Sequence, residues 1–225
     1  MDTRHFRSQW GTDIIIQDYI DQHFPNQNNK GIFVEVGAYD GVDISNTYYL
    51  EKVKGWTGVL VEPIPEKYNL AKHNRWCDVF QGCIFNKNGF EDFQHIKGYS
   101  EMISNINSAC HPSYLDRIKR EIDQHNQEII NIKVPCLTLN SLLDCYNITK
   151  ADYLSLDTIT SELKVLQAYN VNDNPIKIIS LDFNNINTDE LKKWFQENGY
   201  RQLWKNDKVD EYIFINDDIK FTWQK

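Results

Sequence analysis

One short stretch, residues 31–41 (GIFVEVGAYDG), most constrains how this chain can fold. Its apolar residues 32–34 are β-branched or aromatic and follow one another without a polar interruption, which is the pattern of a strand buried on both faces. The strand ends in Glu35 and a turn with two glycines, and residues 45–47 (SNT) can then cap a helix. Strand, glycine turn and helix N-terminus form a ligand-binding corner in doubly wound sheets. We therefore expect the chain to be built around this turn.

The spacing of the glycines indicates which ligand the turn holds. A dinucleotide-binding turn reads G-x-G-x-x-G, because its backbone presses against a pyrophosphate. Here Gly37 and Gly41 enclose three residues, among them Tyr39 and Asp40, and the acid makes a poor cradle for phosphate. S-adenosylmethionine (SAM) carries no phosphate; backbone N–H groups suit its carboxylate and nearby acids suit its ammonium. A buried strand with an ordinary tight turn is the alternative.

A second strand ends in another acid. Residues 56–61 (WTGVLV) have the pattern of a buried strand, and Glu62 and Pro63 follow. An acid at this place can accept hydrogen bonds from both ribose hydroxyls, as the acid about 20 residues after the glycines does in dinucleotide-binding folds. A solvated strand end is the alternative for Glu62. The residues that we expect to bind SAM here are Glu35, Gly37, Ala38, Tyr39, Asp40, Gly41, Asn46, Thr47, Glu62 and Pro63.

Composition and charge narrow the class of protein. With 225 residues and 41% hydrophobic content, the chain fits a single domain over residues 1–225 with its own core. No stretch reaches the ~18 apolar residues of a membrane span, and the first ten residues do not resemble a secretory signal. The five scattered cysteines lack C-x-x-C spacing, so we expect a reduced, cytoplasmic chain. A net charge of −8 without a basic stripe makes nucleic acid a poor partner.

Strand and helix patterns alternate along the rest of the chain. A helix is expected at 12–24, before the first strand. Further strands are expected at 78–85, 129–134, 153–156 and 176–181, and further helices at 66–75, 138–146, 161–169 and 188–198. The chain closes in an antiparallel hairpin of residues 200–204 and 211–215. This α/β order, a mostly parallel sheet that ends in an antiparallel hairpin, favours the Rossmann-like fold of class I SAM-dependent methyltransferases over a dehydrogenase.

Two stretches depart from this alternation. Residues 86–89 (NKNG) are typical of a hairpin turn that leads into 90–96, and Asn86 stands where an adenine edge would bind. Residues 99–128 are polar and contain a charged helix at 112–127, so we expect an insertion over the site or at an oligomer contact. A solvated surface helix is the alternative. Within this insertion, His111 is a possible base, although a surface histidine is the simpler interpretation.

The chain resembles the FkbM family of SAM-dependent methyltransferases. The stretches that carry the resemblance are SQxGxD (8–13), FVEVGAYDG (33–41) with SNT (45–47), VEPIPE (61–66), VPCLTLNSLL (134–143), YLSLDT (153–158), SEL (161–163), ENGY (197–200) and EYIFIN (211–216). The resemblance covers most of the chain. It implies methyl transfer from SAM to a hydroxyl of a sugar, nucleotide-sugar, glycan or polyketide-like metabolite. Separately, the acidic charge predicts no nucleic-acid partner, and the stretch 99–128 leaves a homo-oligomer open.

One departure from the family's pattern concerns the catalytic rim. Asp157 follows the expected strand at 153–156. After this aspartate the family usually has Glu-Gly, and here Ile159 and Thr160 stand in their place. The reaction requires an acceptor oxygen aligned behind the sulfonium methyl and a base that takes its proton. We expect Asp157, Asp182 and Glu162 to be catalytic, and Asp157 and Asp182 to be able to hold Mg²⁺. A structural cap of the next helix is the alternative for Asp157.

Three classes of function remain open at this point. The first is an O-methyltransferase acting on a sugar, nucleotide-sugar or glycan. The second is an RNA or cap methyltransferase, which would need a basic groove that the sequence does not show. The third is a catalytically inactive SAM-fold binding protein, prompted by Ile159 and Thr160. The intact Gly37, Gly41 and Glu62 argue against the third class, because an inactive copy has no reason to retain a cofactor turn.

Overall fold

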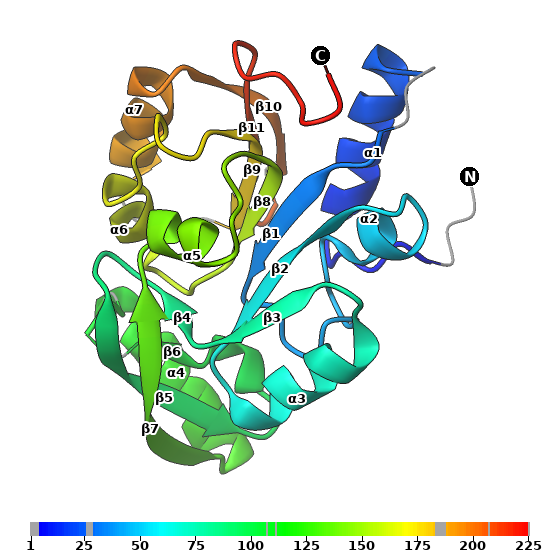
Figure 1. Ribbon diagram of the computed structural model, residues 1–225. Coiled ribbons are helices and arrows are strands. Elements are labelled where there is room, and N and C mark those ends of the chain that lie inside the picture. The colour runs from blue at the N-terminus through cyan, green and yellow to red at the C-terminus, as the bar shows by residue number, and fades with distance from the viewer. Residues whose placement is uncertain are drawn as a thin grey trace.

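The structure is a computed structural model that describes residues 5–25, 29–106, 108–110, 112–182, 188–206 and 208–224. In this part of the chain, a seven-stranded sheet has the order β10-β11-β9-β8-β1-β2-β3 (Figure 1). Its strands are β1 (Ile32–Val36), β2 (Thr57–Glu62), β3 (Asp78–Gln81), β8 (Ala151–Leu156), β9 (Ile176–Asp182), β10 (Tyr200–Asn206) and β11 (Glu211–Asn216).

The pairing within this sheet confirms the predicted fold class. The strands β3, β2, β1, β8 and β9 are parallel to their neighbours. The strand β11 runs antiparallel to both β9 and β10, so the chain ends in the predicted hairpin. Because the carboxyl ends of parallel strands meet at one edge, the residues that follow β1, β2 and β8 gather there.

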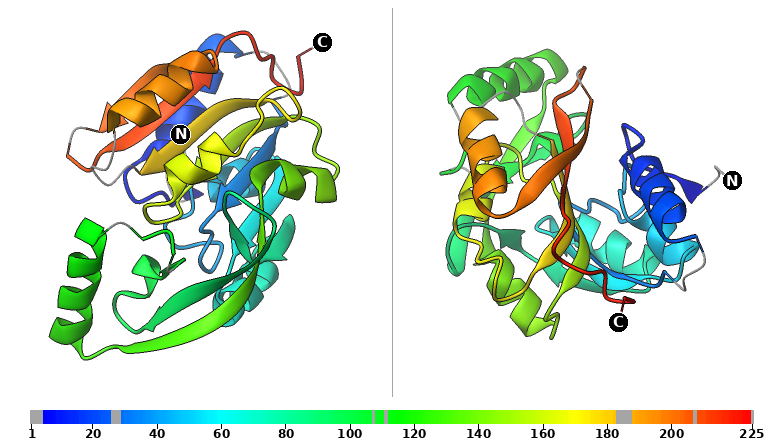
Figure 2. Two further views of the ribbon diagram at one scale, coloured as in Figure 1. Left: turned by 90° about the vertical axis from the view of Figure 1, so that its left-hand side faces the viewer. Right: turned by 90° about the horizontal axis from the view of Figure 1, so that it is seen from above.

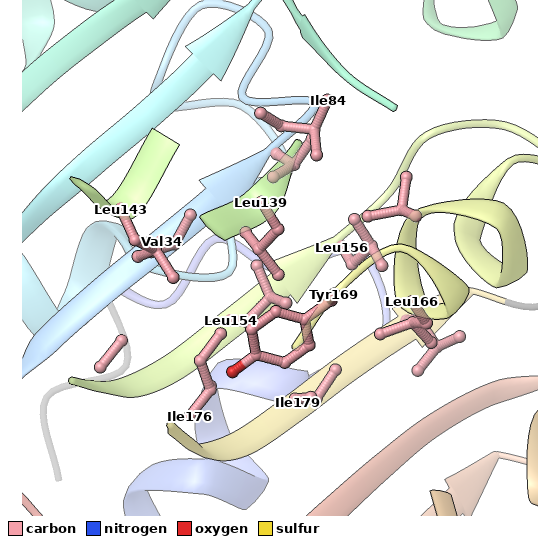
Figure 3. Close-up of a cluster of buried hydrophobic side chains, with 14 of the residues drawn as sticks. Val34, Ile84, Leu139, Leu143, Leu154, Leu156, Leu166, Tyr169, Ile176 and Ile179 are labelled. Carbon is pink, nitrogen blue, oxygen red and sulfur yellow. The ribbon is translucent and has the colours of Figure 1, made fainter. Parts of the chain in front are cut away.

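Helices cover both faces of the sheet (Figures 1 and 2). They are α1 (Thr12–His23), α2 (Tyr48–Lys52), α3 (Pro65–Asn74), α4 (Pro112–His125), α5 (Leu139–Cys145), α6 (Glu162–Gln167) and α7 (Thr188–Glu197). Successive strand side chains point to opposite faces, and accordingly Val34 packs with residues of α5, α6 and α7 whereas Phe33 packs with residues of α1, α2 and α3. Figure 3 shows the first of these two cores. None of the helices in the described part of the chain has the length and apolar character needed to span a bilayer.

A smaller sheet contains β4 (Cys83–Ile84), β5 (Gly89–Lys97), β6 (Asn105–Ile106) and β7 (Glu128–Leu137) in the order β4-β7-β5-β6. The prediction of a single strand at 78–85 is therefore wrong, because the chain leaves the seven-stranded sheet at Gly82. The Gly82 N–H donates to the Glu62 carbonyl oxygen at 3.2 Å. A Cβ at Gly82 would lie 2.5 Å from the Pro135 carbonyl oxygen, so this close crossing requires glycine.

The predicted hairpin at 86–89 is also wrong, since β7 lies between β4 and β5. The strand β5 pairs with β7 over its whole length, from Gly89 opposite Cys136 to Lys97 opposite Glu128. The side chain of Asn88 explains the difference, because it accepts a hydrogen bond from the Thr138 N–H at 2.8 Å. The turn is thus tied to the end of β7, a contact that the local turn motif does not reveal.

Candidate functional site

The glycine turn after β1 approaches the end of β8 closely. Gly37 has a φ of +83°, and a Cβ there would lie 2.4 Å from the Asp157 carbonyl oxygen. Only glycine fits this position without displacing the backbone. The N–H groups of Gly37 and Ala38 both donate to the Val61 carbonyl oxygen at 3.1 Å. The turn is therefore fixed between the ends of β2 and β8.

Glu62, at the end of β2, is buried against this turn. Its Oε2 accepts a hydrogen bond from the Tyr39 N–H and its Oε1 one from the Ile64 N–H, both at 2.8 Å. Burial raises the pKa of Glu62 to about 8, although these two bonds oppose the shift. A carboxylate has about four lone-pair sites, so Glu62 can still accept from two hydroxyl donors. This capacity fits the ribose diol of SAM.

A cavity opens between the turn, Glu62 and the smaller sheet. It encloses about 670 Å³ of space, part of which is open to solvent. The described residues that line it are Val36, Gly37, Tyr39, Ile44, Val61, Glu62, Pro63, Ile64, Gly82, Cys83, Ile84, Phe93, Glu101, Met102, Ser104, Ile106, Asp157, Thr158 and Ile159. Its mixture of apolar walls with a few polar groups is typical of ligand pockets and fits a nucleoside cofactor.

The stretch 99–128, expected as an insertion over the site or at an oligomer contact, supplies one wall of this cavity through Glu101 in the 3₁₀ turn η2 (Glu101–Ile103). The Glu101 carboxylate forms an ion pair of 2.8 Å with Lys67 of α3 and lies at hydrogen-bond distance, 2.8 Å, from the ring nitrogen Nε2 of His95 in β5. It also accepts a hydrogen bond from the Tyr39 hydroxyl at 3.2 Å. The glycine turn, α3 and the stretch 95–101, which are far apart in the sequence, are thus joined at the cavity. No sequence pattern predicted these contacts.

Glu35 supports the site from inside β1 rather than from its end. Its carboxylate accepts hydrogen bonds from the Ser45 and Thr47 hydroxyls at 2.8 and 2.6 Å and from the Asn46 N–H at 2.6 Å. It also lies 3.4 Å from the fully buried guanidinium of Arg75. Glu35 and Thr47 therefore shape the loop after the glycine turn, and their direct contact with SAM stays a prediction.

A second cavity lies on the other side of Asp157, with about 400 Å³ of space that is likewise partly open. The described residues that line it are Gln9, Trp10, Ile44, Asn46, Ser155, Leu156, Asp157, Ser180, Leu181, Asp182 and Glu211. Two predicted site residues, Asn46 and Asp182, thus lie here instead of in the larger cavity. Asp157 and Ile44 line both cavities, and Asp157 is the ionisable residue of the two.

The carboxylates predicted to be catalytic have raised pKa values. Although Asp157 is exposed to the cavities, the protein around it desolvates its carboxylate and raises its pKa to about 6, with a contribution from the charge of Glu35. Burial, followed by the charges of Asp157 and Glu162, raises the pKa of Asp182 to about 8. Burial also raises the pKa of Glu162 to about 7. The Glu162 carboxylate accepts bonds from the N–H and hydroxyl of Thr158 at 2.9 and 3.1 Å, so it caps the loop after β8.

The remaining predicted residues take less direct positions. The Asp40 carboxylate accepts bonds from the Val42 and Asp43 N–H groups, at 2.8 and 2.9 Å, and so closes the loop that contains Gly41. Asn86 is exposed just beyond β4 and is not among the described lining residues. His111 lies outside the described residues. Within those residues, no group of three or more His, Cys, Asp or Glu side chains is arranged to hold a metal ion, so Mg²⁺ gains no support.

Ile159 and Thr160, which replace the family's usual Glu-Gly, connect the rim to the insertion. Both have positive φ, +51° and +67°, a conformation that costs energy for β-branched residues. Ile159 packs against a buried cluster that includes Ile103 and Ile118, and the Thr160 hydroxyl donates to the Ala109 carbonyl oxygen at 3.4 Å. The substitution therefore exchanges a carboxylate for an apolar contact with the wall over the cavity.

Strand order and cavity position together define the Rossmann-like fold of class I SAM-dependent methyltransferases. The METTL16 MTase domain is similar over 98% of this chain and 71% of its own, with a TM-score of 0.52 at 8% identity. Methyltransferase FkbM from Methylobacillus flagellatus KT is similar over 83% of this chain, with a TM-score of 0.50 at 11% identity, and this chain covers 44% of its length. Identities this low show the fold alone.

The particular family follows from the sequence itself. The family described as Methyltransferase FkbM domain matches residues 35–202, so the chain belongs to the FkbM methyltransferase family. Among curated proteins, none is significantly similar in sequence. The protein is accordingly a SAM-dependent methyltransferase, and the residues around Gly37 and Glu62 fit that cofactor.

Proposed function

We propose that this protein transfers the methyl group of SAM to a hydroxyl of a sugar, nucleotide-sugar or glycan. The observation that carries the proposal is the position of Asp157, which lines both the larger cavity beside the glycine turn and the polar second cavity. SAM supplies an electrophilic methyl group when bound. Glu62 would hold the ribose hydroxyls, and Asp157 would take the acceptor's proton.

The ionisation of Asp157 suits this role. With a pKa of about 6, its carboxylate is mostly ionised at neutral pH while remaining a stronger base than an ordinary aspartate. A general base is most effective when its pKa lies near the working pH. Alignment of the acceptor between the cavities would lower the barrier further, since it removes translational freedom before the reaction.

An RNA acceptor is less well supported. RNA binding requires basic side chains along a phosphate backbone, whereas Asp157, Asp182 and Glu211 line the second cavity. The catalytically inactive alternative is opposed by the presence of Gly37 and Glu62, which we predict to bind the cofactor. Participation of Mg²⁺, a cytoplasmic location and a homo-oligomeric state stay predictions.

The test is methyl transfer from SAM labelled with ¹³C in its methyl group. The acceptors would be methyl glycosides, a uridine-diphosphate sugar, a short oligosaccharide and an RNA oligonucleotide, each with and without Mg²⁺. We expect a new O-methyl resonance with at least one carbohydrate, and none with the Asp157→Asn variant. Calorimetric titration with SAM is run in parallel. SAM binding without transfer to any carbohydrate, or transfer to the RNA, would contradict the proposal.

A further inference from the structure

Two carboxylates lie directly opposite one another in the second cavity. Glu211 of β11 and Asp182 of β9 are register partners in an antiparallel pair, so their side chains project from the same face of the sheet. Like charges at directly opposite positions destabilise a sheet. Both residues line the cavity, and Glu211 is only 5% exposed. Ionisation of both carboxyl groups is therefore unfavourable to the fold unless something else compensates for it, and the charge of Glu211 is one cause of the raised pKa of Asp182.

Protein groups in the described part of the chain compensate for it only partly. The Thr12 hydroxyl donates to Glu211 Oε1. Glu211 Oε2 and Asp182 Oδ1 are buried and have no hydrogen-bond partner among the described residues. Neither residue belongs to an ion pair in that part of the chain. Among the charges that act most strongly on Asp182, those of Asp157, Glu162 and Glu211 disfavour its ionised form, whereas that of Arg117 favours it. A buried polar atom without a hydrogen-bond partner destabilises the fold.

Such an arrangement is expected where a ligand supplies the missing donors. Natural proteins keep locally unfavourable pairs mainly at functional sites, and this pair adjoins Asp157 in the same cavity. The other polar walls, Gln9 and Asn46, are uncharged side chains that can both donate and accept. Trp10 adds an aromatic surface that is 43% exposed.

We propose that the second cavity is the acceptor subsite, and that Glu211 together with Asp182 selects a donor-rich, non-anionic sugar ring. This rests on the proposed function. Hydroxyl or amine groups of the ring would donate to Glu211 Oε2 and Asp182 Oδ1, the two oxygens without a partner among the described residues, and the apolar C–H face of the ring would pack on Trp10. A carboxylate or phosphate on the same ring is repelled by the ionised carboxylates that line the cavity. Glu211 is thus a specificity-determining residue.

The first test needs no ligand. Glu211→Gln keeps the acceptor for Thr12, removes one of two opposed charges and places an amide near Asp182. At pH 9, above the pKa of about 8 of Asp182, we expect its Tm to rise by about 2–4 °C. Glu197→Gln is the control, because Glu197 is 63% exposed on α7 and its charged neighbour, Lys193 at 3.8 Å, is an exposed cation and not a second acid. A lower Tm for Glu211→Gln would assign Glu211 a structural role and overturn the proposal.

The second test measures sugar binding by saturation-transfer NMR on the full chain saturated with S-adenosylhomocysteine. The probes are methyl glycosides of glucose, galactose, mannose and rhamnose, with glucosamine and glucuronate as cationic and anionic counterparts. We expect transfer to at least one glycoside and to glucosamine but not to glucuronate. This signal should fall at least fivefold in Glu211→Gln and persist in Glu197→Gln, with unchanged S-adenosylhomocysteine affinity.

The results that contradict the acceptor subsite differ from those that contradict the proposed function. Equal signals from glucuronate, no transfer to any neutral glycoside, or an unaffected Glu211→Gln variant would overturn the subsite. Methylation of a glycoside at equal rates by the wild type and Glu211→Gln would do the same while leaving the proposed function intact. Binding of glycosides through Glu211 without any methyl transfer would support the subsite and refute the proposed function.

Discussion

Replacement of Glu62 by Ala tests the cofactor site most directly, because this carboxylate is the predicted partner of both ribose hydroxyls. A hydrogen bond to a charged group contributes about 1.5–3 kcal/mol, so the loss of two costs at least about 3 kcal/mol. Since about 1.4 kcal/mol corresponds to a tenfold change in Kd, we expect SAM to bind about a hundredfold more weakly or worse. Isothermal titration calorimetry with SAM and with S-adenosylhomocysteine measures this directly.

The structure also predicts how this affinity depends on pH. The pKa of Glu62 is raised to about 8, so much of the free protein carries a protonated Glu62 at neutral pH. Hydroxyl donors favour the ionised carboxylate, and SAM binding should therefore release a proton. The affinity of the wild type should rise between pH 6 and pH 9, and that of Glu62→Ala should not. Calorimetry in buffers of different ionisation enthalpy counts the released proton.

Two comparisons make the result interpretable. Glu62→Ala also leaves the Tyr39 and Ile64 N–H groups without their acceptor, so its folding must be verified by circular dichroism and thermal unfolding. Glu66→Ala removes the same charge from an exposed position in the first turn of α3 and should leave Kd unchanged. A folded Glu62→Ala protein that binds SAM within about threefold of the wild type would refute the assignment of Glu62.

Three further predictions concern the turn and the rim. Gly37→Ala places a Cβ 2.4 Å from the Asp157 carbonyl oxygen, so it should abolish SAM binding and lower the free energy of unfolding. The control is Gly11→Ala, because Gly11 also has a positive φ but a Cβ there would have nothing within 4 Å. Gly37→Ala should therefore destabilise the fold more than Gly11→Ala. Equal losses in urea titrations would contradict this. Asp157→Asn should reduce turnover about 10²–10⁴-fold with little change in SAM affinity. It should also remove the rise in rate near pH 6 that we expect of the wild type. Undiminished turnover would show that Asp157 has a structural role. Asp182 has a pKa of about 8 when folded against about 3.9 when unfolded, so the folded state binds more protons between these values and stability falls as pH rises through them. The gain in Tm from Asp182→Asn should therefore grow from pH 5 to pH 8 and then level off, and a gain independent of pH would show that the carboxyl is not perturbed.

The strand and turn around Gly37 could be predicted because their determinants are local. An uninterrupted apolar run specifies a buried strand, and a glycine specifies a backbone conformation that other residues avoid. The placement of Glu62 at the next strand end followed from the same short-range pattern. The family resemblance extended this reasoning over most of the chain, and the match over residues 35–202 confirmed it.

The misplaced elements share one cause, which is that strand pairing is a long-range property. Residues 78–85 have the pattern of one strand, and only the close passage of Gly82 by Pro135 shows that the chain changes sheets there. The turn at 86–89 has the composition of a hairpin, but a local motif does not specify which strand becomes the neighbour. The strand β7 comes later in the sequence and occupies that place.

The sequence by itself determined the doubly wound fold, the cofactor turn and the acids at the ends of β2 and β8, because each depends on residues close together in the chain. Only the tertiary structure decided which side chains share a cavity. Glu211 faces Asp182 because β11 pairs antiparallel with β9, and Glu101 reaches Lys67 because the smaller sheet folds back over the turn. Burial then raised the pKa values of Asp182 and Glu211, since desolvation depends on what surrounds a group in space and not on its neighbours in sequence.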